Sequence, residues 1–504
     1  MRVAIRADAS ASLGTGHLRR CLALGQALAD CGAESFFVSR PLDEVAALVL
    51  RAQPFDCHWL REPVAAQGDD AAQSAQALAN LAPDWVVVDH YTLGEGWHRA
   101  VHEKTGARIF VIDDLADRPL APQLLLDVNL RRGGPAKYTA MVRSRAAILS
   151  GPRYALLDAA FAATPKHVVG ETVASIGIFM GGADAAGACL SAVRACREVA
   201  GFQGLIEVVS SPISPRHQQL LALCAQLPAT EVLEGLPNLA DFFRRHDLQI
   251  GAGGGAALER CCMGVPSLVC DVAPNQLESL PGLADAGAVV WVRGTGNLTQ
   301  ALGHALPPLL HNTALRRGLA ERSSDLVDGL GAPRVAAVLC CAAGALLAAR
   351  PAEQRDEKLL LDWANDPEVR AQGFHPERIA AQDHSAWFTA RLADARRCRI
   401  FIVNAPNGVA VGQVRLERCD GGWEIGFSLD PAFRGLGLGQ RLLLAGLSAG
   451  DRAPRLIGRV KPSNEASARV FRALGFKASR VSDIRGEHWL FSKEGALAQV
   501  SDNS

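Results

Sequence analysis

The chain has 504 residues and equal numbers of basic and acidic side chains, 52 of each. A formal net charge of zero provides no field that would attract nucleic acid or an anionic membrane, which excludes partners bound through bulk charge. A chain of this length predicts about three or four domains.

The cysteines and the apolar segments bear on the cellular compartment. Thirteen cysteines are scattered without a Cys-x-x-Cys pair, which favours free thiols in a reducing compartment over disulfides or a zinc site. Charged Arg2, Arg6 and Asp8 interrupt the only early apolar run, so we expect no signal peptide. The apolar stretch 335–349 is too short to cross a bilayer and predicts a buried helix. We therefore expect a cytoplasmic protein that binds no metal, membrane or nucleic acid.

Two successive α/β units occupy the N-terminal part of the chain. Runs of Val, Ile and Leu without alternation predict strands that are buried on both faces of parallel sheets. The strands predicted for the first unit are 3–7, 36–39, 85–89, 109–112, 124–128 and 147–149. Those predicted for the second are 176–180, 206–209, 250–251, 267–272 and 289–292. Two Rossmann-like halves, connected through residues 151–169, predict a glycosyltransferase-B type fold.

The first strand runs into a glycine-flanked turn, which brings His17 to the start of a helix predicted over 18–29. Gly14 and Gly16 let the backbone approach a ligand closely, and unpaired N–H groups at a helix start favour an anion. A histidine there can transfer a proton near neutral pH beside a bound phosphate. The alternative is a solvated histidine on a capped core helix. The position after the first strand, where ligands of α/β folds bind, favours the functional interpretation.

Glycine-rich turns also follow two strands of the second unit, at 180–184 and at 250–255, where a helix carrying Glu259 begins. Such turns on both halves suit a ligand with a central diphosphate, such as a nucleotide sugar. Glu259 can accept hydrogen bonds from ribose hydroxyls, or it can simply complement the helix dipole. Asp113 and Asp114 are a candidate acid–base pair, but adjacent strand residues point to opposite faces and cannot act as a facing pair.

In this order the motifs resemble the nucleotide-sugar hydrolases of the pseudaminic acid pathway, the PseG type. The resemblance covers about residues 1–330 and includes Asp8, the run 14–21, Asp89-His90-Tyr91 and the run 251–266. It implies a MurG-like fold, His17 as the base that activates water, and hydrolysis of UDP-2,4-diacetamido-2,4,6-trideoxy-β-L-altropyranose. The residues implied in binding this UDP-sugar are Asp8, Gly14, Gly16, Arg20, Gly182, Gly253, Gly254, Glu259, Asn275 and Gln276. Arg19 departs from the pattern, in which a hydrophobic residue is expected.

Near residue 350 the pattern changes to α+β. Helices are predicted over 359–363 and 384–392, and antiparallel strands over 399–404, 409–417 and 423–429. Arg434-Gly-Leu-Gly-Leu-Gly439 then joins the last of these strands to a helix predicted over 441–447. The backbone N–H groups of this motif can surround a pyrophosphate. An ordinary surface turn is the alternative.

This motif, with the downstream segments 460–467 and 471–476, resembles the GNAT acetyltransferases over about residues 349–495. The start of the domain, 360–370, resembles the PseH type, which acetylates an amino sugar. The resemblance implies acetyl-CoA as cosubstrate, bound by Leu429, Arg434, Gly435, Gly437, Gly439, Gln440 and Asn464. Glu424 is the candidate base for the amine, and pairing with Arg415 across the sheet is the alternative.

Phe471 stands where many GNAT enzymes have a tyrosine that acts as the acid. Phenylalanine cannot donate a proton, so Ser467, His488 or water would have to protonate the leaving thiolate.

Together these inferences predict a bifunctional enzyme with domains 1–155, 156–345 and 349–495. The C-terminal domain would acetylate the 4-amino group of a UDP-sugar, and the N-terminal part would then release UDP and the free diacetamido sugar. One alternative is a MurG-type glycosyltransferase with an appended acetyltransferase, which an acceptor-dependent product would identify. The other is a UDP-sugar-binding scaffold with degenerate sites, which Phe471 modestly favours and His17 argues against.

Overall fold

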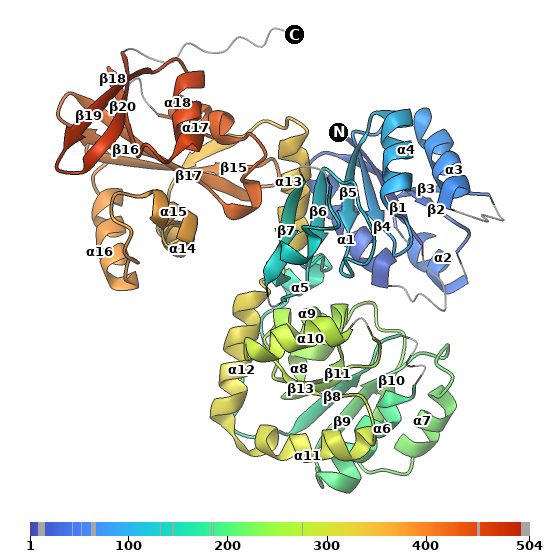
Figure 1. Ribbon diagram of the computed structural model, residues 1–504. Helices are drawn as coiled ribbons and strands as arrows, with labels where there is room; N and C mark the ends of the chain where they lie inside the picture. Colours follow the sequence, from blue (N-terminus) through green and yellow to red (C-terminus); the bar gives the residue numbers. More distant parts are fainter. Residues whose placement is uncertain are drawn as a thin grey trace. The chain divides into compact units, whose positions relative to one another are not determined.

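The computed structural model describes residues 1–8, 16–42, 44–51, 53–61, 67–131, 133–143, 146–182, 184, 186–274, 276–450 and 454–494. The chain forms two compact units (Figure 1). Unit 1 comprises residues 1–29 and 33–336, and unit 2 comprises residues 30–32 and 337–504.

The first sheet of unit 1 has seven strands, all of them parallel. They are β1 (Arg2–Ala7), β2 (Glu34–Ser39), β3 (Asp56–Trp59), β4 (Trp85–Asp89), β5 (Arg108–Ile112), β6 (Leu124–Asp127) and β7 (Ala147–Ser150). The helices are α1 (Gly16–Asp30), α2 (Glu44–Arg51), α3 (Gln67–Ala79) and α4 (Glu95–Thr105). The strand order is β3-β2-β1-β4-β5-β6-β7, so the winding reverses at β1, the type of position at which open α/β sheets bind ligands.

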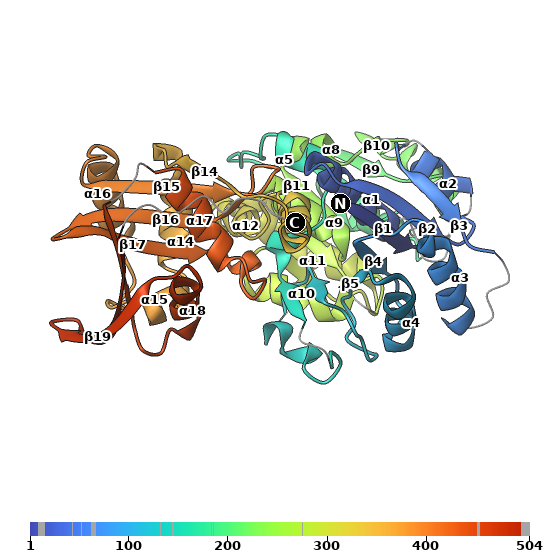
Figure 2. The same ribbon diagram turned by 90° about the horizontal axis from the view of Figure 1, so that it is seen from above.

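Burial on both faces accounts for the composition of the central strands. All five residues of β4 are buried, as are the last five of β1, because helices cover both faces of the sheet. Figure 2 shows α1 on one side of β1 and β4, with α3 and α4 on the other. Trp97 and Val101 of α4 pack with Val86 and Val88 of β4 in one of the hydrophobic cores.

The second sheet of unit 1 is also parallel and has six strands. They are β8 (Ser175–Phe179), β9 (Leu205–Val209), β10 (Thr230–Leu233), β11 (Leu248–Ala252), β12 (Ser267–Cys270) and β13 (Val290–Val292), in the order β10-β9-β8-β11-β12-β13. The helices that precede and follow these strands are α5 (Ala159–Ala163), α6 (Ala188–Arg194), α7 (His217–Cys224), α8 (Ala240–Arg245), α9 (Gly255–Met263), α10 (Gln276–Asp285), α11 (Leu298–His311) and α12 (Thr313–Leu326). Two separate cores flank this sheet, as expected for a doubly wound half.

Unit 2 contains a seven-stranded, mostly antiparallel sheet. Its strands are β14 (Ala348–Pro351), β15 (Cys398–Asn404), β16 (Ala410–Cys419), β17 (Gly422–Leu429), β18 (Arg455–Val460), β19 (Lys477–Asp483) and β20 (Gly486–Glu494), in the order β14-β15-β16-β17-β18-β20-β19. The helices are α14 (Glu357–Ala364), α15 (Pro367–Gln372), α16 (Ala381–Leu392), α17 (Gly439–Ser448) and α18 (Glu465–Ala473). The first three lie on one face of the sheet, and α17 and α18 on the other (Figure 1).

The apolar stretch 335–349 is only partly helical. Helix α13 (Gly331–Ala342) ends before Gly344, which has a φ of 101°, and β14 begins at Ala348. The prediction of a single buried helix through residue 349 is therefore wrong at its C-terminal end, because a left-handed glycine ends the helix. No helix in the described part of the chain is long and apolar enough to cross a membrane.

Candidate functional site

Aspartates stand at the carboxyl ends of four adjacent strands of the first sheet. Asp8 follows β1, Asp89 ends β4, Asp113 follows β5 and Asp127 ends β6. Parallel strands end at the same edge of a sheet, so these carboxyl groups share one edge with the start of α1. This edge is the first candidate site.

His17, on the first turn of α1, contacts this edge through Asp89. Its Nδ1 lies 2.6 Å from Asp89 Oδ1, and the edge of the Tyr91 ring packs against the imidazole at 4.6 Å between centroids. An ionised carboxylate can only accept, so Nδ1 donates its proton to Asp89, and the Arg20 nitrogen that lies 3.0 Å from Nδ1 donates to Asp89 Oδ1 instead. In this tautomer the Nε2 lone pair is left to act as a base. The geometry therefore matches a histidine that is oriented by a carboxylate.

The same carboxylate is held by Arg20, one helical turn along α1. The Arg20 guanidinium donates to both oxygens of Asp89 at 2.5 Å. Burial raises the pKa of Asp89, but the charge of Arg20 and the hydrogen bonds from Arg20 and His17 outweigh burial and hold this pKa well below its usual range. Asp89 thus stays ionised and fixes the His17 tautomer. The sequence motif contains Asp89 but carries no sign of this role.

Asp8 is occupied by the protein's own donors. Arg6 donates to both of its oxygens at 2.5 and 3.0 Å, and the Arg40 backbone N–H donates at 3.0 Å. His90 Nδ1 accepts the Thr92 N–H, so its Nε2 carries the proton that it donates to Asp8 over 3.1 Å. Burial raises the pKa of Asp8, and the bonds from His90 and Arg6 more than reverse this. A direct contact of Asp8 with substrate stays a prediction.

The glycine-rich turn of the second half leads from β11 into α9. Gly254 has φ 75° and ψ −154°, a conformation that favours glycine, and a Cβ on Gly253 would lie 3.0 Å from Leu280 Cδ1. Gln276 opens α10 and accepts the Val272 N–H at 2.9 Å, so its side chain anchors the neighbouring loop. Gly182 follows β8. Gly14 and Asn275 lie outside the described residues.

Glu259 is half-buried on α9. Burial raises the pKa of this carboxyl to about 7, and the charges of Arg260 and Arg19 oppose the rise. Arg19 lies on α1, next to Arg20, and is the residue that departs from the family pattern. Its positive charge lies within electrostatic range of Glu259 in the second half of unit 1. The sequence carried no signal for this pairing because the two residues come from different halves.

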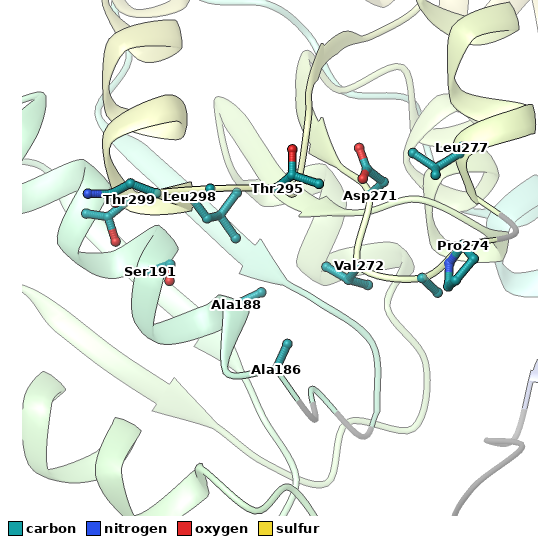
Figure 3. Close-up of a pocket in the computed structure, with 14 residues that line it drawn as sticks. Ala186, Ala188, Ser191, Asp271, Val272, Pro274, Leu277, Thr295, Leu298 and Thr299 are labelled. Carbon is teal, nitrogen blue, oxygen red and sulfur yellow. The ribbon is translucent and has the colours of Figure 1, made fainter.

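A cavity of about 690 Å³ lies at the carboxyl edge of the second sheet (Figure 3). Its walls come from the start of α6, the loop after β12 and the loop before α11, with Ser191, Asp271 and Thr295 as polar members. Glu259 and the glycines at 253 and 254 do not line it. The cavity is therefore adjacent to the predicted nucleotide-binding loops rather than formed by them.

The second candidate site lies in unit 2, where β17 and β18 separate. These parallel neighbours pair only at Trp423 with Leu456 and at Glu424 with Ile457, after which they diverge. The wedge leaves the backbone of the last β17 residues, up to Leu429, without a partner strand on that side. The loop after β17 contains Gly435 and Gly437 at φ 75° and 73°, and a Cβ on Gly439 would lie 2.8 Å from Val470 Cγ2.

Arg434 and Asn464 hold the edges of this loop region. The Arg434 guanidinium pairs with Asp366 at 2.8 Å and Glu368 at 2.9 Å, so it fastens the loop to α15. Asn464 caps α18 by accepting the Ser467 N–H at 3.1 Å. Gln440 lies in the first turn of α17. Contacts of these residues with a cosubstrate stay predictions.

Glu424 stands at the vertex of the wedge. One carboxylate oxygen pairs with Arg459 of β18 and the other with Arg485 at 3.3 Å. The alternative pairing with Arg415 is wrong, because the guanidinium of Arg415 lies 3.8 Å from Glu417 instead. Arg459 and Arg485 lie 35 and 61 positions from Glu424 in the sequence. Pairing between consecutive strands therefore could not predict that they contact this carboxylate.

Phe471 is buried at 2% exposure and packs against three other rings, with Phe476, Phe491 and Phe427 at 5.0, 5.1 and 5.7 Å between centroids. A Cβ on Gly458 would lie 2.3 Å from Phe471 Cζ, so the glycine in β18 leaves the space that this ring fills. No proton donor occupies that position on α18. Phe471 therefore acts as an apolar wall of the domain.

Comparison with known proteins divides the chain in the same way. Residues 347–477 match the family described as the acetyltransferase (GNAT) domain. The chain is 27% identical over 210 residues to the spore coat polysaccharide biosynthesis protein SpsG of Bacillus subtilis strain 168, which covers 41% of this chain and 62% of that protein. The chain thus spans less than two thirds of this relative.

Among solved structures, one is similar to two thirds of the chain and another to about a third. MurG of Acinetobacter baumannii matches 67% of this chain and 98% of its own, at 15% identity and a TM-score of 0.50. The spermidine N-acetyltransferase of Vibrio cholerae, solved with CoA and spermine, matches 30% of this chain and 96% of its own, at 15% identity and a TM-score of 0.28.

The predicted fold class is confirmed. Unit 1 is a MurG-like, glycosyltransferase-B type pair of Rossmann-like halves, and the C-terminal domain has the GNAT acetyltransferase fold. The family match also confirms acetyl-CoA as the acyl donor expected for the C-terminal domain.

Proposed function

We propose that the protein is a bifunctional enzyme that acetylates a UDP-4-amino sugar and then hydrolyses the UDP-2,4-diacetamido-2,4,6-trideoxy-β-L-altropyranose that results. The observation that carries the hydrolase half is the hydrogen bond from His17 Nδ1 to Asp89, which leaves the Nε2 lone pair to act as a base at the carboxyl edge of the first sheet. The observation that carries the acetyltransferase half is the wedge between β17 and β18 in a domain of the GNAT family.

In the hydrolase step, His17 Nε2 accepts a proton from water while the water oxygen forms a bond to the anomeric carbon. The bond between this carbon and the diphosphate oxygen breaks, and UDP leaves with the electron pair. A diphosphate is a good leaving group, so one general base, worth about 10²–10⁴-fold, and stabilisation of the anion are sufficient. The turn at Gly253 and Gly254 and the start of α9 would supply backbone N–H groups to the diphosphate.

In the acetyltransferase step, the neutral 4-amino group attacks the thioester carbon of acetyl-CoA. The carbon–sulfur bond breaks, and CoA leaves as the thiolate. Glu424 would take the amine proton, for which Arg485 or Arg459 must yield one carboxylate oxygen. Phe471 cannot donate a proton, so Ser467, His488 or water would neutralise the thiolate.

The charges around Glu424 favour an acceptor that carries phosphate. Two glutamates, Glu417 and Glu424, form ion pairs with four arginines: Arg391, Arg415, Arg459 and Arg485. Surplus positive charge would repel a polycationic amine and attract a nucleotide diphosphate. This supports a UDP-linked amino sugar as the substrate.

The decisive experiment incubates the purified protein with the UDP-4-amino sugar and acetyl-CoA and follows the products by mass spectrometry. We expect a UDP-sugar that has gained one acetyl group, followed by UDP and the free diacetamido sugar. Without acetyl-CoA, the UDP-4-amino sugar should persist. If acetylated UDP-sugar accumulates and is never hydrolysed to UDP and free sugar, the hydrolase half of the proposal is refuted.

The MurG-like fold of unit 1 favours one rival function, a nucleotide-sugar glycosyltransferase. This rival predicts that UDP appears only when a sugar or lipid acceptor is added, and that the sugar is recovered on the acceptor. The hydrolase predicts UDP and free sugar in equal amounts with no acceptor present. The same assay therefore separates the two.

A further inference from the structure

The aspartates at the carboxyl edge of the first sheet differ in how they are neutralised. Four of them have a cationic partner within ion-pair distance. These pairs are Asp8 with Arg6 at 2.5 Å, Asp89 with Arg20 at 2.5 Å, Asp113 with Arg118 at 2.8 Å and Asp127 with Lys137 at 2.8 Å. A cationic side chain of the protein therefore neutralises each of these four carboxylates.

Asp114, which follows Asp113 in the loop after β5, is the exception. Its backbone carbonyl accepts from Arg131 and, at 3.0 Å, from Lys137 Nζ, so its main chain is fixed. Its carboxyl is half-buried, and the enclosed oxygen Oδ1 has no hydrogen-bond partner among the described residues. An enclosed acceptor without a donor is destabilising, so it calls for an explanation.

The neighbouring carboxyl differs in having a cation: Asp113 Oδ2 also lacks a hydrogen bond, but it pairs with Arg118 at 2.8 Å. Asp113 Oδ1 accepts the backbone N–H groups of Leu115 and Ala116 at 3.1 and 2.8 Å, which shapes the turn. The pair that sequence analysis considered as a joint acid–base unit therefore has two different roles. Asp113 is structural, and Asp114 Oδ1 has no donor among the described residues.

Asp114 lies within electrostatic range of Arg20 and Asp89, the two residues that hold His17. The charges of Arg20 and Asp89 both act on the Asp114 carboxyl, with Arg20 stabilising its ionised form. Burial, together with Asp113, Asp89 and Asp127, has the opposite and larger effect and raises the pKa of Asp114. The carboxyl therefore lies within electrostatic range of Arg20 and Asp89, which both contact His17, in surroundings that suit a neutral hydrogen-bonding partner rather than another charge.

We propose that Asp114 is a sugar-positioning residue of the hydrolase site, and that its carboxyl accepts a hydrogen bond from the hydroxyl or an acetamido N–H of the hexose. The proposal rests on the function proposed for unit 1. The hexose supplies the donor that Oδ1 lacks, and the hydrogen bond orients the anomeric carbon toward the water held by His17. UDP alone has no hexose and cannot make this contact.

The test compares the affinities of UDP-2,4-diacetamido-2,4,6-trideoxy-β-L-altropyranose and UDP by calorimetry, in a His17→Gln background that prevents turnover. Asp114→Ala should raise the Kd of the UDP-sugar about tenfold, the loss of roughly one good hydrogen bond, and leave the Kd of UDP unchanged. Asp114→Asn, which keeps an acceptor oxygen, should lose less. The matched control is Asp117→Ala, in the same loop, whose carboxylate is 53% exposed and pairs with Arg118.

Two outcomes would overturn the proposal. Equal changes in both affinities, or a lower melting temperature with no selective change, would make Asp114 a structural residue. Unchanged affinities for both ligands in Asp114→Ala would exclude a contact with the sugar. Because binding is measured, these results are independent of whether the wild-type protein releases UDP, so failure of the proposed hydrolase activity would be recognised separately.

Discussion

At the scale of single residues, the first site depends on long-range pairs between charged groups. The sequence predicted His17 as a base from its position after the first strand, and the structure gives this residue a partner, Asp89, which lies 72 positions away. A motif can reveal that an aspartate ends a strand, but not which side chain it orients. The tautomer of His17 therefore could not be predicted from sequence alone.

Replacing His17 with glutamine should abolish the release of UDP and leave acetylation intact. Glutamine occupies similar space but cannot accept a proton, so we expect kcat for hydrolysis to fall by about 10²–10⁴-fold. Release of UDP is measured by chromatography, and acetyl transfer by the CoA thiol formed in the same sample. Near-normal hydrolysis by this variant would exclude His17 as the base.

The pH dependence of UDP binding should reveal Glu259. Its pKa is raised to about 7, so the carboxyl is mostly protonated at pH 6 and mostly ionised at pH 8. Only the ionised form offers full acceptor strength to ribose hydroxyls, so UDP should bind up to about tenfold more tightly at pH 8 than at pH 6. Calorimetry on Glu259→Gln provides the control, since the titration of UDP itself is common to both proteins. If both proteins show the same pH dependence, Glu259 has no role in binding UDP.

At the scale of elements, apolar runs predicted most strands of unit 1, including the edge strands β7 and β13, but they missed two other edge strands of that unit and the inner strands β18 and β20 of unit 2. β4 is found at the bounds that its apolar run predicts, because both faces are covered. β3 (Asp56–Trp59) and β10 (Thr230–Leu233) were missed; each is a short edge strand with one neighbour and no apolar run. β19 is exposed along almost its whole length, so hydrophobic pattern gives no signal for it.

The packing of α18 on β18 gives a prediction about one glycine. An alanine at Gly458 would bring its Cβ to 2.3 Å from Phe471 Cζ, and the ring is confined by three other phenylalanines. Gly458→Ala should therefore lower the free energy of unfolding by about 1–3 kcal/mol, as overpacked cores do. Gly450→Ala is the control, since its added Cβ would meet atoms only at the ordinary distance of 3.6 Å. Equal melting temperatures for the two variants would contradict this packing argument.

At the scale of the whole molecule, the two proposed activities belong to different units. His17 lies in unit 1, and the loop with Gly437 lies in unit 2. The change from parallel, uniformly apolar strands to long antiparallel ones predicted two kinds of fold. The domain boundaries at 155, 345 and 349 stay predictions. Composition could not indicate whether the product of one site passes directly to the other.

A complementation experiment tests whether each unit carries one of the two proposed activities. Gly437→Trp forces a bulky residue into a position with φ 73° in the loop proposed to hold the CoA pyrophosphate. It should abolish acetyl transfer while leaving hydrolysis of the diacetamido UDP-sugar unchanged, and this preserved activity also controls for folding. His17→Gln should have the opposite phenotype.

Neither variant alone should convert the UDP-4-amino sugar to free diacetamido sugar, but a mixture of the two should. If the intermediate is released and rebinds, the lag before free sugar appears in the mixture will shorten as total protein concentration rises. Intact enzyme at the same concentration of each site will then show the same lag as the mixture. If fusion raises the local concentration of the intermediate at the second site, intact enzyme will have a shorter lag than the mixture at every concentration. A mixture that produces acetylated UDP-sugar but never free sugar would contradict the assignment of both activities to independent sites in this chain.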